Sequence, residues 1–155
     1  KYFDLHYLEP EKLNKIILIC FFLLAALIIA GIATHVLKIF FGRWRPETMI
    51  YTGVSGFSWF NLAHDAKSFP SGHSQLIWTV AVCLLLIYPR LIIFYLATAI
   101  LVSFSRVMLN QHFVSDVVLG AYLGSIVPIL INSYVFIPRG LNISLIKDQH
   151  INKLG

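Results

Sequence analysis

The sequence predicts an all-α membrane protein, a polytopic helix bundle of four spans that forms one domain over residues 1–155. Of its residues, 58% are hydrophobic and only 12% are charged, whereas roughly a quarter of an average soluble domain is charged. The mean hydropathy is +0.79, and four apolar stretches each approach the length of about 20 residues that crosses a bilayer. A soluble domain of this length could not bury so much apolar surface. The composition therefore excludes a disordered chain and an ordinary soluble globule.

The first two predicted segments are an interfacial stretch and a spanning helix. Residues 1–15 mix aromatic and aliphatic side chains with charges, which predicts a segment lying on the bilayer surface. Residues 16–33 form an unbroken apolar run of 18 residues, and its helical pattern continues to residue 41. In the polar segment 42–70 that follows, glycines and prolines interrupt any regular pattern. Its tryptophan and phenylalanine rings stand among charges, which is typical of the membrane–water interface.

Three further spanning helices are predicted, at residues 71–88, 91–109 and 113–136. A tight turn at Pro89-Arg90 separates the first two, and the polar bridge 110–112 separates the last two. A polar tail, residues 139–155, completes the chain. Since each span crosses the bilayer once, the 42–70 loop and the 110–112 bridge lie on one side of the membrane. The unusual polar residues therefore gather on that side, which indicates a site.

Several residues in or beside the apolar runs are interpreted as structural. Gly120 and Gly124 lie four residues apart, so that another helix can approach closely. Cys20 and Cys83 lie within apolar runs and are expected to pack rather than form a disulfide or a metal site. The basic residues behind the net charge of +5 are scattered between the apolar runs. Loop orientation in the membrane and an anionic ligand explain this distribution better than nucleic-acid binding does. Four histidines are interpreted as satisfied interfacial side chains: His6, His35, His64 and His150.

Three basic residues, Lys38, Arg45 and Arg106, stand at the membrane edge on the side of the site. Each alone could be a snorkelling side chain that reaches the headgroups. Together they favour a bound anion, because two planar guanidinium groups and an ammonium group suit a phosphoryl group. Ser71 and Gly72 precede a span, and free backbone N–H groups at a helix start form a seat for an anion.

Two histidines and an aspartate supply candidate chemistry beside these cations. Asp116 follows His112 by four residues, which places both on one helix face if the helix begins by His112. A carboxylate bonded to one imidazole nitrogen fixes the tautomer and raises the basicity of the other, so His112 is a candidate nucleophile. His73, at the start of a span, could protonate a leaving alkoxide. A metal site formed by these three residues is the alternative, which the neighbouring cations disfavour.

The motifs that carry these residues resemble the three-part signature of the type 2 phosphatidic acid phosphatase superfamily. Its parts here are Lys38-x6-Arg45-Pro46, Pro70-Ser71-Gly72-His73 and Ser105-Arg106-x5-His112-x3-Asp116. All three are complete and in order, and they extend over residues 38–116, about half of the chain. Chance is an inadequate explanation for three complete motifs.

The resemblance implies hydrolysis of a phosphate ester through a phosphohistidine, without a metal or other cofactor. It makes His112 the nucleophile, Asp116 its orienting carboxylate and His73 the general acid. The implied partners are a lipid phosphate substrate and the bilayer, with no nucleic acid. The resemblance also assigns a set of residues, including one backbone N–H, to the phosphoryl oxygens: Lys38, Arg45, Ser71, Gly72 and Arg106. Electrostatic stabilisation of the phosphoryl group would then supply most of the catalysis.

Membrane members of this superfamily usually have six spans, with the site on the last four. The four spans predicted here correspond to those four, so two N-terminal helices are expected to be either missing from this chain or absent. The chain begins with Lys1 rather than methionine, which fits a piece of a longer protein. The superfamily also contains soluble vanadium haloperoxidases, and the four apolar spans argue against that class.

The leading prediction is a membrane lipid phosphatase. Candidate substrates are phosphatidic acid, phosphatidylglycerol phosphate, undecaprenyl diphosphate and the phosphates of lipid A. Two alternatives stay open: a lipid phosphotransferase, which passes the same phosphohistidine to an alcohol, and a non-catalytic membrane scaffold or transporter subunit. The oligomeric state is also open.

The distribution of basic residues predicts which way the site faces. Seven Lys and Arg residues lie on the side opposite the site and five on its own side. Three of those five are assigned to phosphate. Because basic residues near span ends favour the cytoplasm, the site of a bacterial inner-membrane protein is predicted to face the periplasm or the cell exterior.

Overall fold

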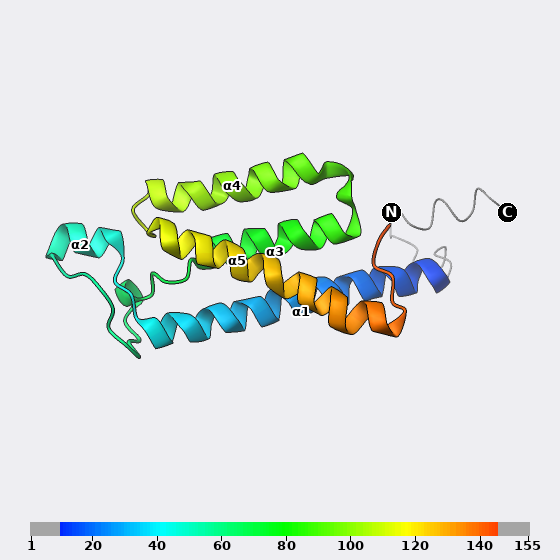
Figure 1. The fold of residues 1–155 in the computed structure, drawn as a ribbon, viewed down its shortest axis with the longest axis horizontal. Helices are drawn as coiled ribbons and strands as arrows, with labels where there is room; N and C mark the ends of the chain where they lie inside the picture. The colour runs from blue at the N-terminus through cyan, green and yellow to red at the C-terminus, as the bar shows by residue number, and fades with distance from the viewer. Residues whose placement is uncertain (1–9, 146–155) are drawn as a thin grey trace, which may run out of the picture.

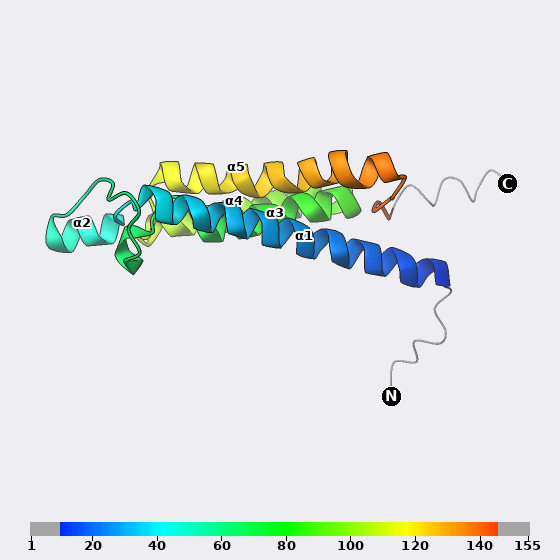
Figure 2. The same ribbon diagram turned by 90° about the horizontal axis from the view of Figure 1, so that it is seen from below.

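The computed structural model describes residues 10–145, and this part of the chain is helical without a β-strand. Four long helices run side by side (Figure 1): α1 (Pro10–Phe41), α3 (Gly72–Ile87), α4 (Ile92–Met108) and α5 (Val114–Ile131). α3 packs against each of the other three and is therefore the central helix. The view from below shows the short helix α2 (Pro46–Thr52) beyond one end of the bundle (Figure 2). The predicted all-α membrane bundle is confirmed.

The predicted spans differ in length. Three helical segments are long and apolar enough to cross a membrane: Pro10–Phe41, Pro89–Met108 and Val114–Arg139. The remaining predicted span is α3, an apolar helix of 16 residues. At a rise of about 1.5 Å per residue it extends about 24 Å, less than the ~30 Å hydrocarbon core of a bilayer. Within residues 10–145, the four expected spans are therefore three full-length helices and one shorter central helix.

Some predicted boundaries change. α1 begins at Pro10, so residues 10–15 continue the first spanning helix instead of lying on the membrane surface. Proline and Glu11 both suit the free N–H groups of a first helical turn, which explains the early start. The rest of that segment, residues 1–9, lies outside the described residues. In the loop predicted as irregular, the chain forms α2 and a 3-10 turn at His64–Ala66.

The C-terminal prediction is tested only in part. Helical backbone continues after α5 through a π-helical turn at Asn132–Phe136 and a 3-10 turn at Ile137–Arg139. The predicted last span to residue 136 is therefore confirmed as helix. Most of the predicted polar tail, residues 146–155, lies outside the described residues.

Gly120 and Gly124 allow α5 to lie directly against α3. A Cβ atom at Gly120 would be 2.4 Å from the Ser71 carbonyl oxygen, and one at Gly124 would be 2.3 Å from the Gln75 carbonyl oxygen. Such separations are inside van der Waals contact, so neither position accepts a side chain at this helix spacing. The predicted close approach is confirmed. It fixes the first turn of α3 against α5, at the end of the bundle that carries the candidate site.

α1 buries one narrow stripe against the bundle. Its buried residues recur every four positions: Phe22, Ala26, Ala30 and Thr34. This spacing keeps them on one helix face, and four residues further on the same spacing brings Lys38 to the site. Cys83 is a buried packing residue of the core at the opposite end of the bundle, whereas Cys20 is exposed on α1. Both cysteines are free thiols.

Aromatic rings anchor the loop between α1 and α3 to the end of α1. The Phe41 ring contacts Trp59 and Phe69, with centroids 5.4 and 5.1 Å apart. Backbone hydrogen bonds join the two halves of the loop, from Arg45 N–H to the Asp65 carbonyl at 3.0 Å and from Ser68 N–H to the Arg43 carbonyl at 2.9 Å. The folded loop therefore holds side chains from both of its ends beside the starts of α3 and α5.

We expect Gly124→Ala to destabilise the bundle by about 1–3 kcal/mol, the usual cost of overpacking a core, because its methyl group would overlap the Gln75 carbonyl. Gly31→Ala is the matched control, since a Cβ at this helical glycine meets nothing within 4 Å. Its better helix propensity should leave stability unchanged or raise it by up to about 1 kcal/mol. Thermal unfolding in detergent, followed by circular dichroism, measures both. Equal melting temperatures for the two variants would contradict the close-packing account.

Candidate active site

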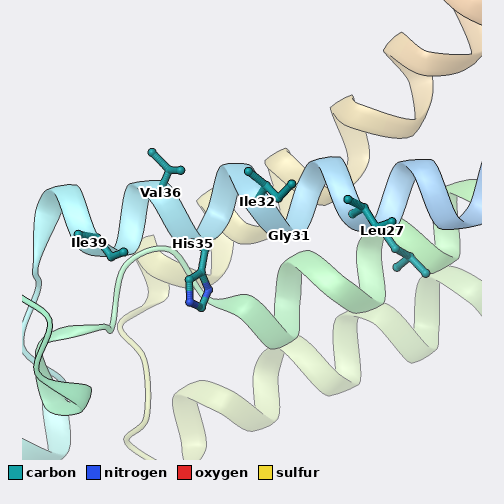
Figure 3. Close-up of a pocket in the computed structure, with 7 residues that line it drawn as sticks. Leu27, Gly31, Ile32, His35, Val36 and Ile39 are labelled. Atoms are coloured by element: carbon teal, nitrogen blue, oxygen red, sulfur yellow. The ribbon is translucent and has the colours of Figure 1, made fainter.

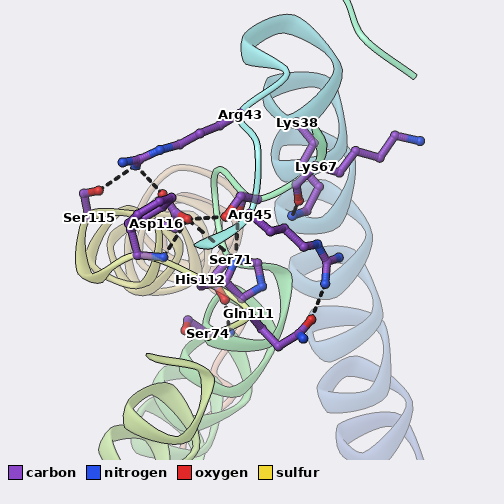
Figure 4. A network of polar contacts seen from close by, with 12 residues as sticks. Lys38, Arg43, Arg45, Lys67, Ser71, Ser74, Gln111, His112, Ser115 and Asp116 are labelled. Carbon is purple, nitrogen blue, oxygen red and sulfur yellow. Dashed lines mark hydrogen bonds and ion pairs between the residues drawn. The ribbon is translucent and has the colours of Figure 1, made fainter. Parts of the chain in front are cut away.

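The predicted site residues gather at one end of the bundle, where α1 ends and α3 and α5 begin (Figure 4). A pocket of about 340 Å³ opens there, and five of the predicted residues line it: Lys38, Arg45, Gly72, His73 and His112. Ser71 and Asp116 are fully buried. Arg106, in the last turn of α4, contacts this region through its carbonyl oxygen, which accepts a hydrogen bond from the His112 N–H at 3.3 Å.

The first turn of α3 borders this pocket. Ser71 is its N-cap, as predicted, and the Ser71 hydroxyl accepts a hydrogen bond from the Ser74 N–H at 3.5 Å. The Ser71 N–H donates to the Asp116 carbonyl at 2.9 Å, which joins the start of α3 to the first turn of α5. A helix N-terminus carries a partial positive charge. Because Gly72 lines the pocket without a side chain, an anion can approach this terminus closely.

His112 is buried, and a backbone carbonyl holds its ring. The Nδ1 atom lies 2.7 Å from the Ser68 carbonyl oxygen, whereas Asp116 Oδ2 is 3.7 Å from the same nitrogen, beyond hydrogen-bond distance. A carbonyl oxygen only accepts, so this geometry assigns the proton to Nδ1 and leaves a lone pair on Nε2. The neutral ring therefore has one free basic nitrogen, and Ser68 rather than Asp116 fixes which one.

His112 and Asp116 are close, as expected, with 3.7 Å between Nδ1 and Oδ2, but the condition that the helix begins by His112 is not met. α5 begins at Val114 with Phe113 as its N-cap, so His112 precedes the helix. Asp116 is instead a capping residue, because its Oδ2 accepts a hydrogen bond from the Phe113 N–H at 2.9 Å. The two side chains approach each other without sharing a helix face.

The sequence did not reveal the main partners of the buried Asp116 carboxylate. Arg43 Nη1 donates to Oδ1 at 2.5 Å, and the Ser68 hydroxyl donates to Oδ2 at 2.5 Å. The same guanidinium donates to Ser115 Oγ at 2.7 Å (Figure 4). Its central carbon lies 4.1 Å from the centroid of the Phe113 ring. Asp116 thus binds the loop between α1 and α3 to α5. Arg43 could have been noticed in the sequence, because it is an additional basic residue within the first motif. Nothing in the sequence distinguishes Ser68 from other serines.

Neutral acceptors hold Lys38 and Arg45 in place. Lys38 Nζ donates to a backbone carbonyl of the loop at 2.8 Å. Arg45 donates to the Gln111 side-chain oxygen, and Gln111 donates in turn to Glu47 at 2.6 Å. Arg45 Nε is buried without a hydrogen-bond partner. Among residues 10–145, neither of these cations nor Arg106 forms an ion pair, so no carboxylate contact competes with an anionic ligand for them.

The residues present suit an anion better than a metal ion. His73 is exposed on the first turn of α3 and lines the pocket, within reach of a group bound there. Within residues 10–145, no three His, Cys, Asp or Glu side chains are placed to hold one metal ion. Asp116, which the metal alternative requires, is already bound by Arg43 and Ser68.

This fold and this site define a class of protein, a helical membrane bundle with histidines and basic side chains around one pocket at its end. The family model of the PAP2 superfamily matches residues 19–138, and the chain belongs to that superfamily. This finding confirms the resemblance to the type 2 phosphatidic acid phosphatases that the three motifs indicate. No solved structure gives a significant match.

Similar curated proteins carry two names. A "lipid A 1-phosphatase" from Rhizobium johnstonii is 32% identical over 127 residues, covering 82% of this chain and 52% of the relative. Another from Rhizobium etli is 31% identical, covering 82% and 54%. An "undecaprenyl-diphosphatase" from Sulfolobus acidocaldarius is 46% identical over 59 residues, covering 37% and 29%. The chain therefore spans about half the length of the Rhizobium proteins it matches.

We expect Arg43→Met to lower the free energy of unfolding by about 2–4 kcal/mol, because it leaves the buried Asp116 carboxylate without its ion-pair partner. Arg43→Lys should recover part of this loss. Combining Arg43→Met with Asp116→Asn should cost less than the sum of the two single changes, since both charges are removed. Arg90→Met, at an exposed turn, is the control and should have little effect. Denaturant unfolding in detergent completes the double-mutant cycle, and a coupling energy near zero would refute the ion pair.

Proposed function

We propose that this chain carries the catalytic site of a metal-independent lipid phosphatase that works through a phosphohistidine at His112. The observation that carries the proposal is a buried imidazole, bound at Nδ1 by a carbonyl, beside cations that no carboxylate neutralises. Membership of the PAP2 superfamily supports it. So does similarity to proteins named lipid A 1-phosphatase and undecaprenyl-diphosphatase. A lipid substrate is favoured because the pocket lies at the end of apolar helices of membrane length.

In the first step, the lone pair of His112 Nε2 attacks phosphorus, and the bond from phosphorus to the leaving oxygen breaks. His73 protonates that oxygen, which departs with the lipid as an alcohol or, from a diphosphate, as a monophosphate. Lys38, Arg45 and Arg106, with the N-terminus of α3, stabilise the charge on the equatorial oxygens. The ring becomes positively charged when Nε2 is phosphorylated, and the Nδ1–H bond to the Ser68 carbonyl stabilises that charge.

In the second step, water attacks the phosphohistidine while His73, now neutral, takes its proton. Inorganic phosphate leaves, and Nε2 regains its lone pair. Asp116 acts on both steps indirectly, because it binds the hydroxyl of Ser68 while the carbonyl of Ser68 binds His112. Ser68 and Arg43 are therefore positioning residues in this mechanism.

The names of the similar proteins favour lipid A and undecaprenyl diphosphate among the candidate substrates. We place the site on the periplasmic or outer face of a bacterial inner membrane, because more basic residues lie on the opposite side.

His112→Ala should abolish phosphate release from lipid A, undecaprenyl diphosphate and phosphatidic acid, together with any trapped phosphoenzyme. His73→Ala should slow lipid hydrolysis by about 10²–10⁴-fold, the usual contribution of general acid–base catalysis. It should still form phosphoenzyme from p-nitrophenyl phosphate, whose leaving group needs no proton. Wild-type activity should survive EDTA and be inhibited by orthovanadate, a mimic of five-coordinate phosphorus. Phosphate release and rapid-quench trapping measure these outcomes.

His64→Ala is the matched control for these variants, because His64 is exposed in the loop and should leave activity unchanged. A fully active His112→Ala would show that the nucleophile lies elsewhere. Loss of activity in EDTA that Mg²⁺ restores would overturn the metal-free mechanism.

We expect Ser55→Cys, at an exposed loop position, to react with a membrane-impermeant maleimide in intact spheroplasts. Arg90→Cys, at the exposed turn before α4, should react only after permeabilisation, since it lies on the opposite side. Both are made with Cys20→Ala, because Cys20 is exposed, whereas Cys83 is buried. The reverse labelling pattern would place the site in the cytoplasm.

A further inference from the structure

Three polar side chains form a chain of hydrogen bonds that ends at the catalytic pocket. Arg45 Nη1 donates to the side-chain oxygen of Gln111 (Figure 4), and Gln111 Nε2 donates to Glu47 Oε2 at 2.6 Å. Arg45 lines the catalytic pocket, and it also lines a second, polar pocket of about 410 Å³ together with Gln111 and Glu47. Arg45 therefore stands between the two pockets, with Gln111 and Glu47 on the side of the second.

Backbone hydrogen bonds hold Gln111 and Glu47 in register with the candidate nucleophile. The Glu47 N–H donates to the Asn110 carbonyl at 3.1 Å, which joins α2 to the bridge before α5. The N–H groups of Gln111 and His112 both donate to the Arg106 carbonyl, at 3.2 and 3.3 Å. The same stretch of backbone therefore places the anchor of Arg45 and the ring of His112.

Gln111 leaves one edge of the Arg45 guanidinium group unoccupied. It takes Nη1, whereas Nε and Nη2 have no hydrogen-bond partner among residues 10–145. Two N–H groups on one edge of a guanidinium group can bind two oxygens of a phosphoryl group together. Because the group is planar and rigid, the bond to Nη1 also fixes the direction of this edge.

The α1 wall of the catalytic pocket gives Arg45 no anionic alternative to Gln111. Its polar side chains are His35 and Lys38, and Lys38 only donates. Figure 3 shows the His35 ring turned from α1 toward the beginning of α3, with aliphatic side chains around it on α1. Within residues 10–145, Gln111 is the side chain that hydrogen-bonds to the guanidinium group of Arg45.

We propose that Gln111 is a positioning residue for Arg45: its neutral amide connects the guanidinium group to the anchoring carboxylate of Glu47 and keeps that negative charge out of contact with it. This inference rests on the function proposed above, in which Arg45 binds phosphoryl oxygens. Glu47 is exposed, so solvent ions screen its charge. A carboxylate in the place of the amide would form an ion pair with Arg45 and compete with the phosphate.

Exchanging the two side chains tests this assignment. Combining Glu47→Gln with Gln111→Glu preserves the net charge and the capacity for both hydrogen bonds, but brings the carboxylate into contact with Arg45. We expect kcat/KM for the best lipid substrate identified above to fall at least about tenfold, because a charged acceptor binds a guanidinium group more strongly than a neutral one. The inhibition constant of orthovanadate should rise by a similar factor.

Asn110→Asp is the matched control. It adds a carboxylate to the same bridge, one residue from Gln111, at an exposed position whose φ of 54° aspartate also adopts. The Asn110 side chain has no hydrogen-bond partner among residues 10–145, so this variant should keep kcat/KM and vanadate inhibition within threefold of wild type. Melting temperature and size-exclusion profile establish that each variant is folded.

A double-mutant cycle tests whether Gln111 acts through Arg45. Gln111→Ala removes the anchor and should lower kcat/KM at least about fivefold. In an Arg45→Met background the same change should have less than a twofold effect, since the group that it positions is gone. This cycle also decides the question if the exchanged variant does not fold, and the exchanged variant decides it if Arg45→Met is too slow to assay.

The outcomes separate this inference from the proposed function. Wild-type kcat/KM in the exchanged variant, or equal losses there and in Asn110→Asp, would overturn the inference while the phosphatase stands. So would a full effect of Gln111→Ala in the Arg45→Met background, which would show a role independent of Arg45. If the wild-type protein hydrolyses no lipid phosphate tested, the proposed function and this inference fail together.

Discussion

The buried carboxylate of Asp116 is the interaction on which the rest of the site depends. Its two oxygens bind Arg43 and Ser68, and its backbone carbonyl accepts the Ser71 N–H. One residue therefore joins the loop after α1, the start of α3 and the start of α5. A buried carboxylate is costly to desolvate unless its hydrogen-bonding capacity is satisfied. The three segments must accordingly assemble around it together, and the ring of His112 is oriented as a consequence, through the carbonyl of Ser68.

The contact between α3 and α5 sets the register that brings Asp116 to the start of α3. The buried residues of α5 recur every four positions from Asp116: Gly120, Gly124 and Pro128. The carboxylate thus heads the same stripe whose glycines touch the backbone of α3. A shift of one helical turn, about 5.4 Å, would separate Asp116 from Ser71 and place larger side chains where only glycine fits. Helix packing inside the membrane part therefore determines the polar contacts at its end.

The helices and the convergence of the motifs were predictable, because apolar length and alternating span direction restrict which chain segments can meet. Lys38, His73 and His112 adopt their expected places for this reason. The orientation of His112 was not predictable, because Ser68 acts through a backbone carbonyl, which every residue carries. The position of that carbonyl depends on how an irregular loop folds over the bundle.

The arrangement of the cations bears on which phosphate the proposed enzyme would accept. Two unit charges about 6 Å apart at an effective dielectric constant of about 20 repel by roughly 3 kcal/mol. Lys38 and Arg45 donate their hydrogen bonds to neutral acceptors, so among the described residues no carboxylate in direct contact offsets this repulsion. The hydrogen bonds of the two cations, and the packing of α1 against α3 and α5, must sustain it until an anion binds. The relief is largest for the ligand with the most negative charge, so a terminal phosphate with two charges gains more than a phosphodiester with one. This charge balance accounts for a site that would act on lipid monoesters and diphosphates while surrounded by an excess of ordinary phospholipid diesters.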